Sequence, residues 1–323
     1  MSDALLRGEH CVIIGGAGAV GRLMVDLMVT TGADVLVVDT ALPPAELAQD
    51  CAYVRGDVCA MDAELAARVR RADIIVLAVH ERAALASVAT LARGLRPGRL
   101  LVDTLSVKTG IVAALADHAA HLDVVSLNPM FAPSLGFDGR PVAAVVVHDG
   151  PRARALLDAI GRRGGCVAEL GADEHDRLTA VTQALTHAAV LAFGLALDDL
   201  GVTVGALAAA APPPHLTLLA MLGRISSAMP ETYWDVQATN PHAHRARTAL
   251  AAGLAKLADA VDHGTACDFG EVVERASRSL GSDRDTYARL CEELFVAALP
   301  PITTVSVPST TAERLGGRAR CLS

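Results

Sequence analysis

Short apolar runs alternate with helical patterns along the first half of the chain. Residues 11–14 form an apolar run before a glycine turn, residues 22–31 have apolar positions at helical spacing, and residues 34–39 alternate as a strand does. Five more apolar runs follow at residues 74–79, 100–103, 124–126, 142–147 and 166–170. Strands that alternate with helices predict an α/β fold, a Rossmann-type, doubly wound and mostly parallel sheet with helices on both faces.

The second half has a different pattern. From Glu174 to about Ala298 we find only long Ala- and Leu-rich segments at helical spacing, interrupted near residues 212–214, Pro230 and Pro241. We therefore expect a sheet domain over residues 1–171 and an all-helical domain over residues 172–298. Residues 299–323 are rich in Thr, Ser, Pro, Gly and Arg, which predicts a weakly ordered tail.

Composition and charge narrow the class of protein. The 323 residues are 52% hydrophobic and 20% charged, which suits two packed globular units. The formal net charge is −8 and no basic block relieves it, so a nucleic-acid partner is not expected. Residues 1–10 lack the apolar stretch of a secretory signal, and prolines interrupt the uncharged stretch at residues 201–223. We expect a cytoplasmic protein with no membrane partner.

The cysteines indicate neither a disulfide framework nor a metal site. The chain has seven, with no C-x-x-C pair and no close histidine partner. We expect reduced and mostly buried thiols, and no bound metal.

A glycine-rich segment follows the first predicted strand and opens a helix. Gly16, Gly18 and Gly21 form G-x-G-x-x-G, the dinucleotide-binding fingerprint in its usual context. We expect Gly16 to permit the tight turn, Gly18 to let a pyrophosphate approach the backbone, and Gly21 to let helix and strand pack closely. The N–H groups at the start of the helix would then face the phosphates.

Asp39 ends the second predicted strand at the spacing of the ribose-binding acid. Its carboxylate would accept hydrogen bonds from the ribose hydroxyls and repel a 2′-phosphate, so NAD is favoured over NADP. FAD is less favoured, because no second flavin-contacting segment is visible. Five other residues of the turn and of later strand ends complete the predicted cofactor site: Ala17, Val20, Ala78, Val79 and Thr104.

Three further segments carry polar side chains suited to a reacting centre. Ser106 and Lys108 follow the strand at residues 100–103, at the edge of the sheet where open α/β folds bind ligands. Residues 126–133, with Asn128, leave the next strand at the same edge. In the helical half the sequence has Glu174-His175-Asp176, then Gln183 and His187 on one helix face, and then Arg224.

In this order the motifs resemble those of the prephenate dehydrogenases and their arogenate and aminodeoxyprephenate relatives. That family has the glycine fingerprint, a strand ending L-V-D-x-x-S-V-K, a segment H-P-M-F-G-P, an E-H-D, a helix with Q-x-x-x-H and a later V-G-R. The corresponding segments of this chain follow in the same order: residues 101–108, residues 128–133, residues 174–176, Gln183 with His187, and residues 222–224. The resemblance covers roughly residues 11–294.

The resemblance implies a reaction, a set of site residues and a homodimer. NAD⁺ takes hydride from ring C4 of a cyclohexadiene dicarboxylate while C1 loses its carboxylate as CO₂. Arg224 would bind a substrate carboxylate, for which a guanidinium fork is suited. His187 and Gln183 would line the substrate pocket, Ser106 would hydrogen-bond near C4, and Lys108 is a weaker candidate for the same pocket. His175 ranks behind His187 and has a structural interpretation.

The chain departs from the family pattern at Asn128, where the family has the histidine that accepts a hydrogen bond from the C4 hydroxyl. An amide cannot take up that proton, and general-base catalysis of this kind contributes on the order of 100- to 10,000-fold. A C4 amine is a stronger electron donor than a hydroxyl and can expel hydride without a protein base. We therefore expect Asn128 and Ser106 to serve oxidation of 4-amino-4-deoxyprephenate to 4-aminophenylpyruvate.

Other functions stay open on the sequence alone. The chain could be a prephenate or arogenate dehydrogenase that tolerates Asn128. A β-hydroxyacid dehydrogenase would need a catalytic lysine on the first long helix, and residues 179–197 contain none. An NAD-binding sensor without catalysis would keep the glycines and Asp39, but it would have little use for Gln183, His187 and Arg224.

Overall fold

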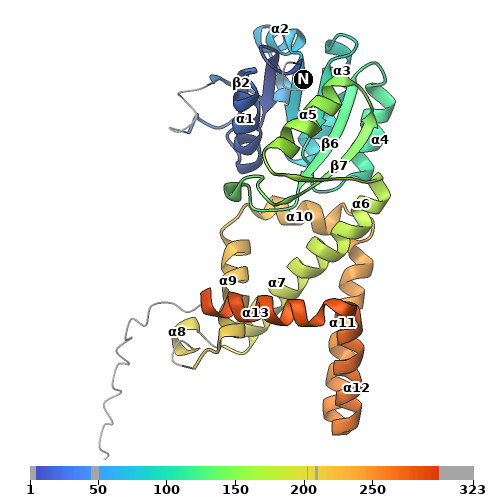
Figure 1. Ribbon diagram of the computed structural model, residues 1–323. Helices are drawn as coiled ribbons and strands as arrows, with labels where there is room; N and C mark the ends of the chain where they lie inside the picture. Colours follow the sequence, from blue (N-terminus) through green and yellow to red (C-terminus); the bar gives the residue numbers. More distant parts are fainter. Residues whose placement is uncertain (1–4, 45–50, 202, 208–209, 298–323) are drawn as a thin grey trace, which may run out of the picture.

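The computed structural model describes residues 5–44, 51–201, 203–207 and 210–297 (Figure 1). Its first half contains one eight-stranded sheet with the order β3-β2-β1-β4-β5-β6-β7-β8. Strands β1 to β6 run parallel, β7 is antiparallel to β6, and β8 is parallel to β7. The strands are β1 (His10–Ile14), β2 (Asp34–Asp39), β3 (Ala52–Arg55), β4 (Ile74–Leu77), β5 (Leu100–Asp103), β6 (Asp123–Pro129), β7 (Pro141–His148) and β8 (Cys166–Glu169). The predicted Rossmann-type fold is confirmed.

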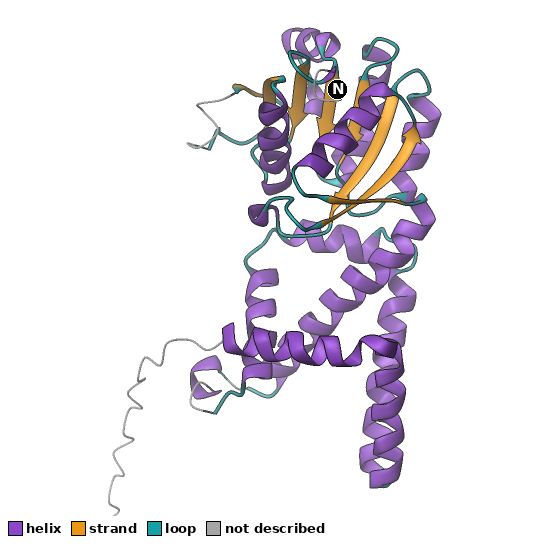
Figure 2. Ribbon diagram, in the orientation of Figure 1, coloured by secondary structure: helices purple, strands orange, loops and turns teal. Residues whose placement is uncertain are grey.

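Helices cover both faces of this sheet (Figure 2). The side chains of β1 alternate between two apolar clusters: Cys11 and Ile13 pack with α1 and α5, and Val12 and Ile14 pack with α2, α3 and α4. These helices are α1 (Ala19–Thr31), α2 (Ala63–Arg71), α3 (Glu81–Gly94), α4 (Thr109–His118) and α5 (Pro151–Arg162), with short 3₁₀ turns η2 (Val58–Ala60) and η3 (Pro133–Leu135). Because helices bury both faces of the sheet, the inner strands are apolar at nearly every position, and their sequences form continuous apolar runs.

Two strands differ from the sequence-based expectation. Strand β3, a four-residue edge strand without buried residues, was not predicted. Strand β6 is longer than predicted. Its pairing with β5 ends at Ser126, but the ladder with antiparallel β7 continues through Asn128, opposite Ala143. Asn128 is therefore held inside a strand and not in the loop that follows it.

The second half is helical, and no strand occurs after Glu169 among the residues that the structure describes. Helix α6 (Ala172–Thr179), the π-helical segment η4 (Ala180–Leu185) and α7 (Thr186–Asp199) form one continuous helix. The remaining elements are α8 (Val204–Leu207), α9 (Pro213–Ser226), α10 (Pro230–Ala238), α11 (Ala243–Asp262), α12 (Ala266–Ser277), the 3₁₀ turn η5 (Arg278–Asp283) and α13 (Arg284–Ala297). The predicted tail at residues 299–323 lies outside the described residues.

A carboxylate of the helical half caps a helix of the sheet domain. Asp176 accepts hydrogen bonds from the backbone amides of Lys108 and Thr109, each at 2.8 Å, at the start of α4. Asn240, at the end of α10, donates to the carbonyl of Asp176 at 2.8 Å and to the hydroxyl of Thr179 at 3.1 Å. These bonds hold α6 and α10 against the carboxyl edge of the sheet, where the site residues lie (Figure 1).

The cysteines differ from the expectation of mostly buried thiols. Of the six that the structure describes, only Cys11 is buried, whereas Cys59, Cys166 and Cys267 are exposed. The expectation was wrong because these three lie on a surface turn, on the edge strand β8 and on the outlying α12, where no layer covers them.

By length and composition the continuous helix Ala172–Asp199 is long and apolar enough to cross a membrane. The uncharged stretch at residues 201–223 contains instead the short α8 and most of α9. The continuous helix carries five polar residues of the site described below: His175, Asp176, Thr179, Gln183 and His187.

Candidate active site

The turn between β1 and α1 is built from four glycines in close contact with their surroundings. Gly15 has a left-handed backbone with φ of 84°, and a Cβ there would overlap the carbonyl of Ala78. We expected Gly16 to permit the turn, and this assignment was wrong. A Cβ on Gly16 would lie 2.6 Å from Cγ1 of Val37, so its constraint is the approach of β2.

The same turn opens toward the start of α1. Gly18 is the N-cap of α1, and a Cβ on Gly21 would overlap the carbonyl of Gly15. Asp39 fixes the turn from β2, because its carboxylate accepts hydrogen bonds from the amides of Ala17 and Ala41, each at 3.0 Å. An exposed glycine backbone, a free helix N-terminus and an adjacent carboxylate fit the pyrophosphate and ribose of a dinucleotide.

The predicted cofactor residues beyond the turn follow neighbouring strands. Ala78 and Val79 follow β4 and lie against Gly15, and the amide of Ala78 donates to the carbonyl of Ile14 at 2.8 Å. Thr104 follows β5 and donates from its amide to the carbonyl of Leu77 at 3.0 Å. The structure therefore aligns the ends of β1, β4 and β5 along one edge, and Val20 lies in the first turn of α1.

Replacing Asp39 by asparagine is expected to change the preference between the two nicotinamide cofactors. The repulsion between a carboxylate and a 2′-phosphate about 4 Å apart is about 4 kcal/mol at an effective dielectric constant near 20. The uncharged amide of asparagine removes this repulsion. We expect the ratio of kcat/KM for NADP⁺ to that for NAD⁺ to rise at least about tenfold. Steady-state kinetics with both cofactors measure it, with Glu64→Gln on α2 as a charge-matched control. An unchanged ratio would contradict the role of Asp39.

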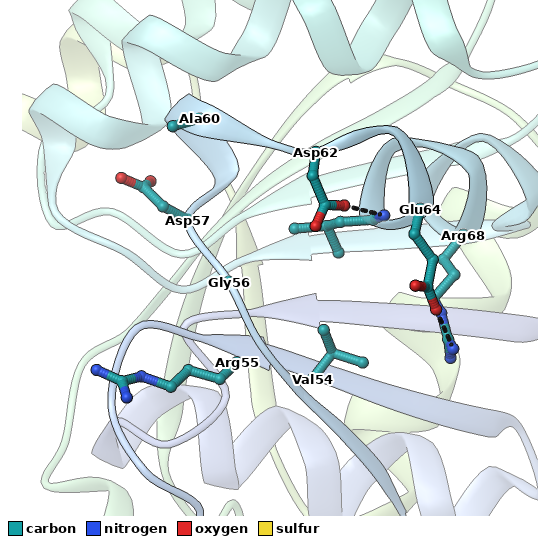
Figure 3. Close-up of a pocket in the computed structure, with 9 residues that line it drawn as sticks. Val54, Arg55, Gly56, Asp57, Ala60, Asp62, Glu64 and Arg68 are labelled. Carbon is teal, nitrogen blue, oxygen red and sulfur yellow. Dashed lines mark hydrogen bonds and ion pairs between the residues drawn. The ribbon is translucent and has the colours of Figure 1, made fainter.

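A small pocket of about 150 Å³ lies where β3 ends, between β3 and α2 (Figure 3). Its polar side chains already have local partners. Asp62 accepts from the amide of Leu65 at 2.8 Å and caps α2, and Glu64 pairs with Arg68 at 2.8 Å. Strand β3 is separated from β6 by four strands, so this pocket belongs to the Asp39 end of the edge and not to the candidate reacting centre.

Ser106 and Lys108 lie in the loop between β5 and α4, but only Ser106 has an exposed part. Lys108 has no exposed surface, and its Nζ donates to the Asp103 carboxylate at 3.2 Å and to the Leu127 carbonyl at 2.7 Å. Burial lowers the pKa of the Lys108 ammonium, and the Asp103 carboxylate opposes this effect. The structure does not bring Lys108 to the predicted substrate pocket. We assign it instead to fixing the end of β6 next to Asn128.

Asn128 is 2% exposed and has a partner from the helical half. Its side-chain nitrogen lies 3.1 Å from Nε2 of His175 on α6, and Nδ1 of His175 lies 2.9 Å from the Asp176 carboxylate. His175 and Asp176 are both fully buried. The structure therefore links Asn128 of the predicted loop segment to His175 and Asp176 of the E-H-D segment through consecutive hydrogen bonds.

The π-helical segment carries Gln183 toward the loop after Asn128. Its amide nitrogen lies 3.7 Å from the sulfur of Met130, and its buried Oε1 has no hydrogen-bond partner. His187 lies one turn further along, and its buried Nδ1 is also without a partner. Because buried polar atoms are nearly always hydrogen-bonded, these two atoms mark a surface suited to a polar ligand. Insertions of π-helix are frequent at functional sites.

Arg224 and Tyr233 complete the surroundings of His187. The Tyr233 ring packs edge-on against the His187 ring, with centroids 4.7 Å apart. Burial lowers the pKa of the His187 imidazole, and the positive charge of Arg224 lowers it further. The ring is therefore neutral near pH 7. Arg224 itself is exposed in the last turn of α9, where it is open to an anionic ligand.

Sequence reasoning named Glu174-His175-Asp176 among the candidate segments but ranked His175 behind His187 and gave Asp176 no role, and it missed Tyr233. The sequence places a histidine and an aspartate side by side at residues 175–176, but it contains no signal that Asn128 lies within hydrogen-bond distance, 47 positions earlier. Tyr233 is one of three tyrosines in an aromatic-poor chain, and this rarity is the signal that would have drawn attention to it.

The chain matches a known domain family. Residues 44–143 match the nucleotide-binding domain of prephenate dehydrogenase. The matched region contains the ends of β4, β5 and β6 and begins after Asp39, so the glycine turn lies outside it.

Individual relatives extend the similarity over most of the chain. A 4-amino-4-deoxyprephenate dehydrogenase from Streptomyces pristinaespiralis is 49% identical over 288 residues, which span 89% of this chain and 97% of that protein. The fold is similar to the crystal structure of A. aeolicus prephenate dehydrogenase in complex with hydroxyphenyl propionate and NAD⁺, with a TM-score of 0.67, 16% identity, and 84% and 96% of the two chains covered. It is also similar to Synechocystis arogenate dehydrogenase, with a TM-score of 0.58, 18% identity, and 86% and 99% covered.

Proposed function

Because this chain belongs to the prephenate dehydrogenase family of NAD-dependent oxidoreductases, we propose that it oxidises 4-amino-4-deoxyprephenate. The products are 4-aminophenylpyruvate, CO₂ and NADH. The relative that is 49% identical carries the name of this activity. The observation on which the proposal depends is Asn128, a buried amide at the position where the family motif has a histidine.

The chemistry of the ring substituent explains why an amide suits this position. Hydride leaves C4 with its electron pair, and the bond from C1 to the carboxylate breaks, so that its electrons complete the aromatic ring and CO₂ departs. A neutral amine on C4 donates its own lone pair as hydride leaves. A hydroxyl is a weaker donor and needs a base to draw on its proton. The Asn128 amide is not such a base, but its oxygen accepts an N–H hydrogen bond.

The other residues of the site bind and orient the substrate in this proposal. Arg224 binds a carboxylate of the substrate through its guanidinium fork. Neutral His187 donates from Nδ1 to an oxygen of the substrate side chain, which satisfies one of the two buried atoms without partners. Gln183 lines the same pocket, and its Oε1 takes only an N–H or O–H donor. Ser106 hydrogen-bonds near C4. NAD⁺ bound along the ends of β1, β2 and β4 supplies the hydride acceptor.

The proposal is tested by kinetics with both ring substituents. The purified protein is given NAD⁺ with 4-amino-4-deoxyprephenate or with prephenate, and NADH formation is followed by absorbance. We expect kcat/KM for the amine to exceed that for the alcohol by at least about tenfold. Faster turnover of prephenate would make the chain a prephenate dehydrogenase, and tight NAD binding without turnover of either diene would indicate a sensor.

Restoring histidine at position 128 is expected to raise activity toward the hydroxylated diene. The Asn128→His variant regains an imidazole that can draw on the C4 hydroxyl proton, so kcat for prephenate should rise about tenfold, which is less than the roughly 100-fold lower end of general-base effects. The Asn128→Gln variant, which has an amide but no base, is the matched control. A histidine variant that gains no more than the glutamine variant would show that the substrate choice is not made at this position.

We also propose that the protein is a homodimer through its helical half. Buried apolar clusters cover both faces of the sheet, but the third cluster, in the helical half, contains only Ala184, Val236 and Ala243. In Figure 1, α12 extends away from the sheet and α13 runs back toward α9. In the most apolar 18-residue segment of the helix Ala172–Asp199, only 17% is buried inside the chain.

Large apolar side chains on these helices need a cover that the single chain does not provide. The exposed ones on α7 and α11 to α13 are Leu191, Leu195, Leu254, Leu257, Val261, Phe269, Val273, Tyr287, Leu290, Leu294 and Val296. A second copy of the chain covers such a surface by two-fold symmetry. Light scattering of the purified protein should give twice the chain mass of 33.3 kDa, and a mass of one chain would contradict the proposal.

The cytoplasm is the compartment that we propose for this activity. The proposed reaction consumes NAD⁺ and a small-molecule substrate, which agrees with this compartment. The chain has a net charge of −8 and no basic block, which agrees with an enzyme that has no nucleic-acid or membrane partner. Recovery of the activity in the membrane fraction of the producing cells would contradict this assignment.

A further inference from the structure

A row of three buried side chains leads from the helical domain to Asn128. The Asp176 carboxylate lies 2.9 Å from Nδ1 of His175, and Nε2 of His175 lies 3.1 Å from the side-chain nitrogen of Asn128. Asp176 and His175 are 0% exposed and Asn128 is 2% exposed. Hydrogen bonds in such an interior are strong, because water does not compete for the same groups.

Asp176 determines which nitrogen of His175 carries the proton. The Asp176 carboxylate accepts hydrogen bonds from the amide of Lys108 at 2.8 Å and from the amide and hydroxyl of Thr109 at 2.8 and 2.5 Å. Burial raises the pKa of this carboxyl, but the bonds from His175, Thr109 and Lys108 outweigh burial and hold the pKa below its usual value. A carboxylate only accepts, so Nδ1 of His175 is the donor toward it.

The proton on Nδ1 in turn determines the orientation of the Asn128 amide. In the neutral ring Nε2 then has a lone pair and no hydrogen, so it accepts. The side-chain nitrogen of Asn128 only donates, and this is the atom that lies beside Nε2. If the amide were rotated by 180°, two acceptors would face each other in a dry interior, and neither would have a donor.

We propose that His175, held by Asp176, is a positioning residue that fixes the Asn128 amide with its oxygen toward the reacting ring carbon. The C4 substituent of the substrate then meets a hydrogen-bond acceptor, which suits an amine with N–H groups to donate. That the substituent is an amine rests on the proposed function. The orientation of the amide rests only on the three side chains.

A role limited to packing the interior accounts less well for these contacts. A packing histidine needs partners for its two nitrogens, and any nearby carbonyl or hydroxyl serves that purpose. Here Nδ1 is paired with the carboxylate that also caps α4, and Nε2 crosses from α6 to Asn128, which stands where the family motif has a histidine. The same Nε2 can accept from a ring N–H of a histidine at position 128, so His175 can orient either residue.

A double-mutant cycle between positions 175 and 128 tests the proposal. His175→Met keeps the size of the side chain and removes the acceptor, and we expect kcat to fall about 100-fold, as for a misplaced reacting group. His175→Gln offers its Oε1 as an acceptor and should stay within about tenfold of the wild type. In the Asn128→Ala background His175→Met should cost less than about threefold, because the residue to be positioned is absent. An equal loss in both backgrounds would overturn the proposal.

Folding and cofactor binding are measured for each variant by thermal unfolding and by NAD⁺ titration. Each variant should still unfold cooperatively, and its affinity for NAD⁺ should be unchanged. A second measurement needs no variant at positions 175 or 128. Long-range ¹H–¹⁵N spectra of ¹⁵N-histidine-labelled wild type should show His175 protonated at Nδ1 and unprotonated at Nε2, with assignment by comparison to variants at the other histidines. A proton on Nε2 would overturn the proposal.

The cycle uses whichever diene the wild type turns over faster. If that diene is prephenate, the proposed amine substrate is wrong, whereas the cycle and the spectra still report on how residue 128 is oriented. If the amine is preferred but the two mutations act independently, the proposed function stands and the positioning role of His175 falls.

Discussion

Replacing Lys108 by methionine is expected to lower the free energy of unfolding by about 3–5 kcal/mol, because it leaves the charge of Asp103 buried and unpaired. Both side chains are 0% exposed, and Nζ of Lys108 lies 3.2 Å from the Asp103 carboxylate. Oδ2 of Asp103 has no hydrogen-bond partner even in the wild type. Methionine is one atom shorter than lysine and carries no charge, so the loss is mainly of the charged partner rather than of volume. Urea unfolding followed by circular dichroism measures it.

Two controls separate this buried pair from charge removal in general. Asp103→Asn in the Lys108→Met background removes the unpaired charge and should recover most of the loss, since the Asn oxygen can still accept from the amide of Leu105. Arg68→Met breaks the exposed pair with Glu64 on α2 and should cost less than about 1 kcal/mol. A Lys108→Met variant no less stable than Arg68→Met would show that the interior pair contributes nothing.

Replacing Arg224 by glutamine is expected to lower kcat/KM for the diene by about 100- to 1,000-fold, mainly through KM. The guanidinium is the cation that sequence and structure place beside His187, where it is open to a substrate carboxylate. Glutamine keeps a polar side chain but neither the charge nor the two-pronged donor. Steady-state kinetics at fixed NAD⁺ measure the loss. Arg224→Lys should recover part of it, and Arg93→Gln on the surface of α3 serves as the charge-matched control.

The same variant has a second, spectroscopic consequence. Burial is the largest cause that lowers the pKa of His187, and the charge of Arg224 adds to it. Removing that charge should therefore raise the pKa of His187 toward the ordinary histidine value while burial still holds it below. An NMR titration of the His187 ring in wild type and Arg224→Gln tests this direction. A pKa that does not move, together with unchanged KM, would place Arg224 outside the site.

The fold was predictable where the sequence pattern has a local cause. Strands buried on both faces must be apolar throughout, so the inner strands could be read from short runs. Neither edge strand has a buried residue; β8 was predicted and β3 was not. The reversal of β7 depends on the loop between Pro129 and Pro141, which joins neighbouring strands without a crossover helix. The glycine spacing predicted the cofactor turn, although not which glycine has the left-handed backbone.

The candidate site was predictable residue by residue only in part. Ser106, Asn128, Gln183, His187 and Arg224 were found because they belong to ordered family motifs, which are properties of the sequence. Lys108 belongs to the same motifs, yet its ammonium lies in the interior against Asp103 and the carbonyl of Leu127. Burial depends on what the second half of the chain places over the loop, and no local pattern encodes that.

The amino-acid sequence by itself determined the family, the cofactor turn and the amide at position 128, because each of these is a matter of residue types at short spacing. Only the tertiary structure decided that His175 and Asp176 lie behind that amide and which of its two atoms lies beside His175. The contact between Asn128 and His175 forms only when the helical half packs against the sheet. The direction of each hydrogen bond depends on which nitrogen of His175 carries the proton, and Asp176 determines that.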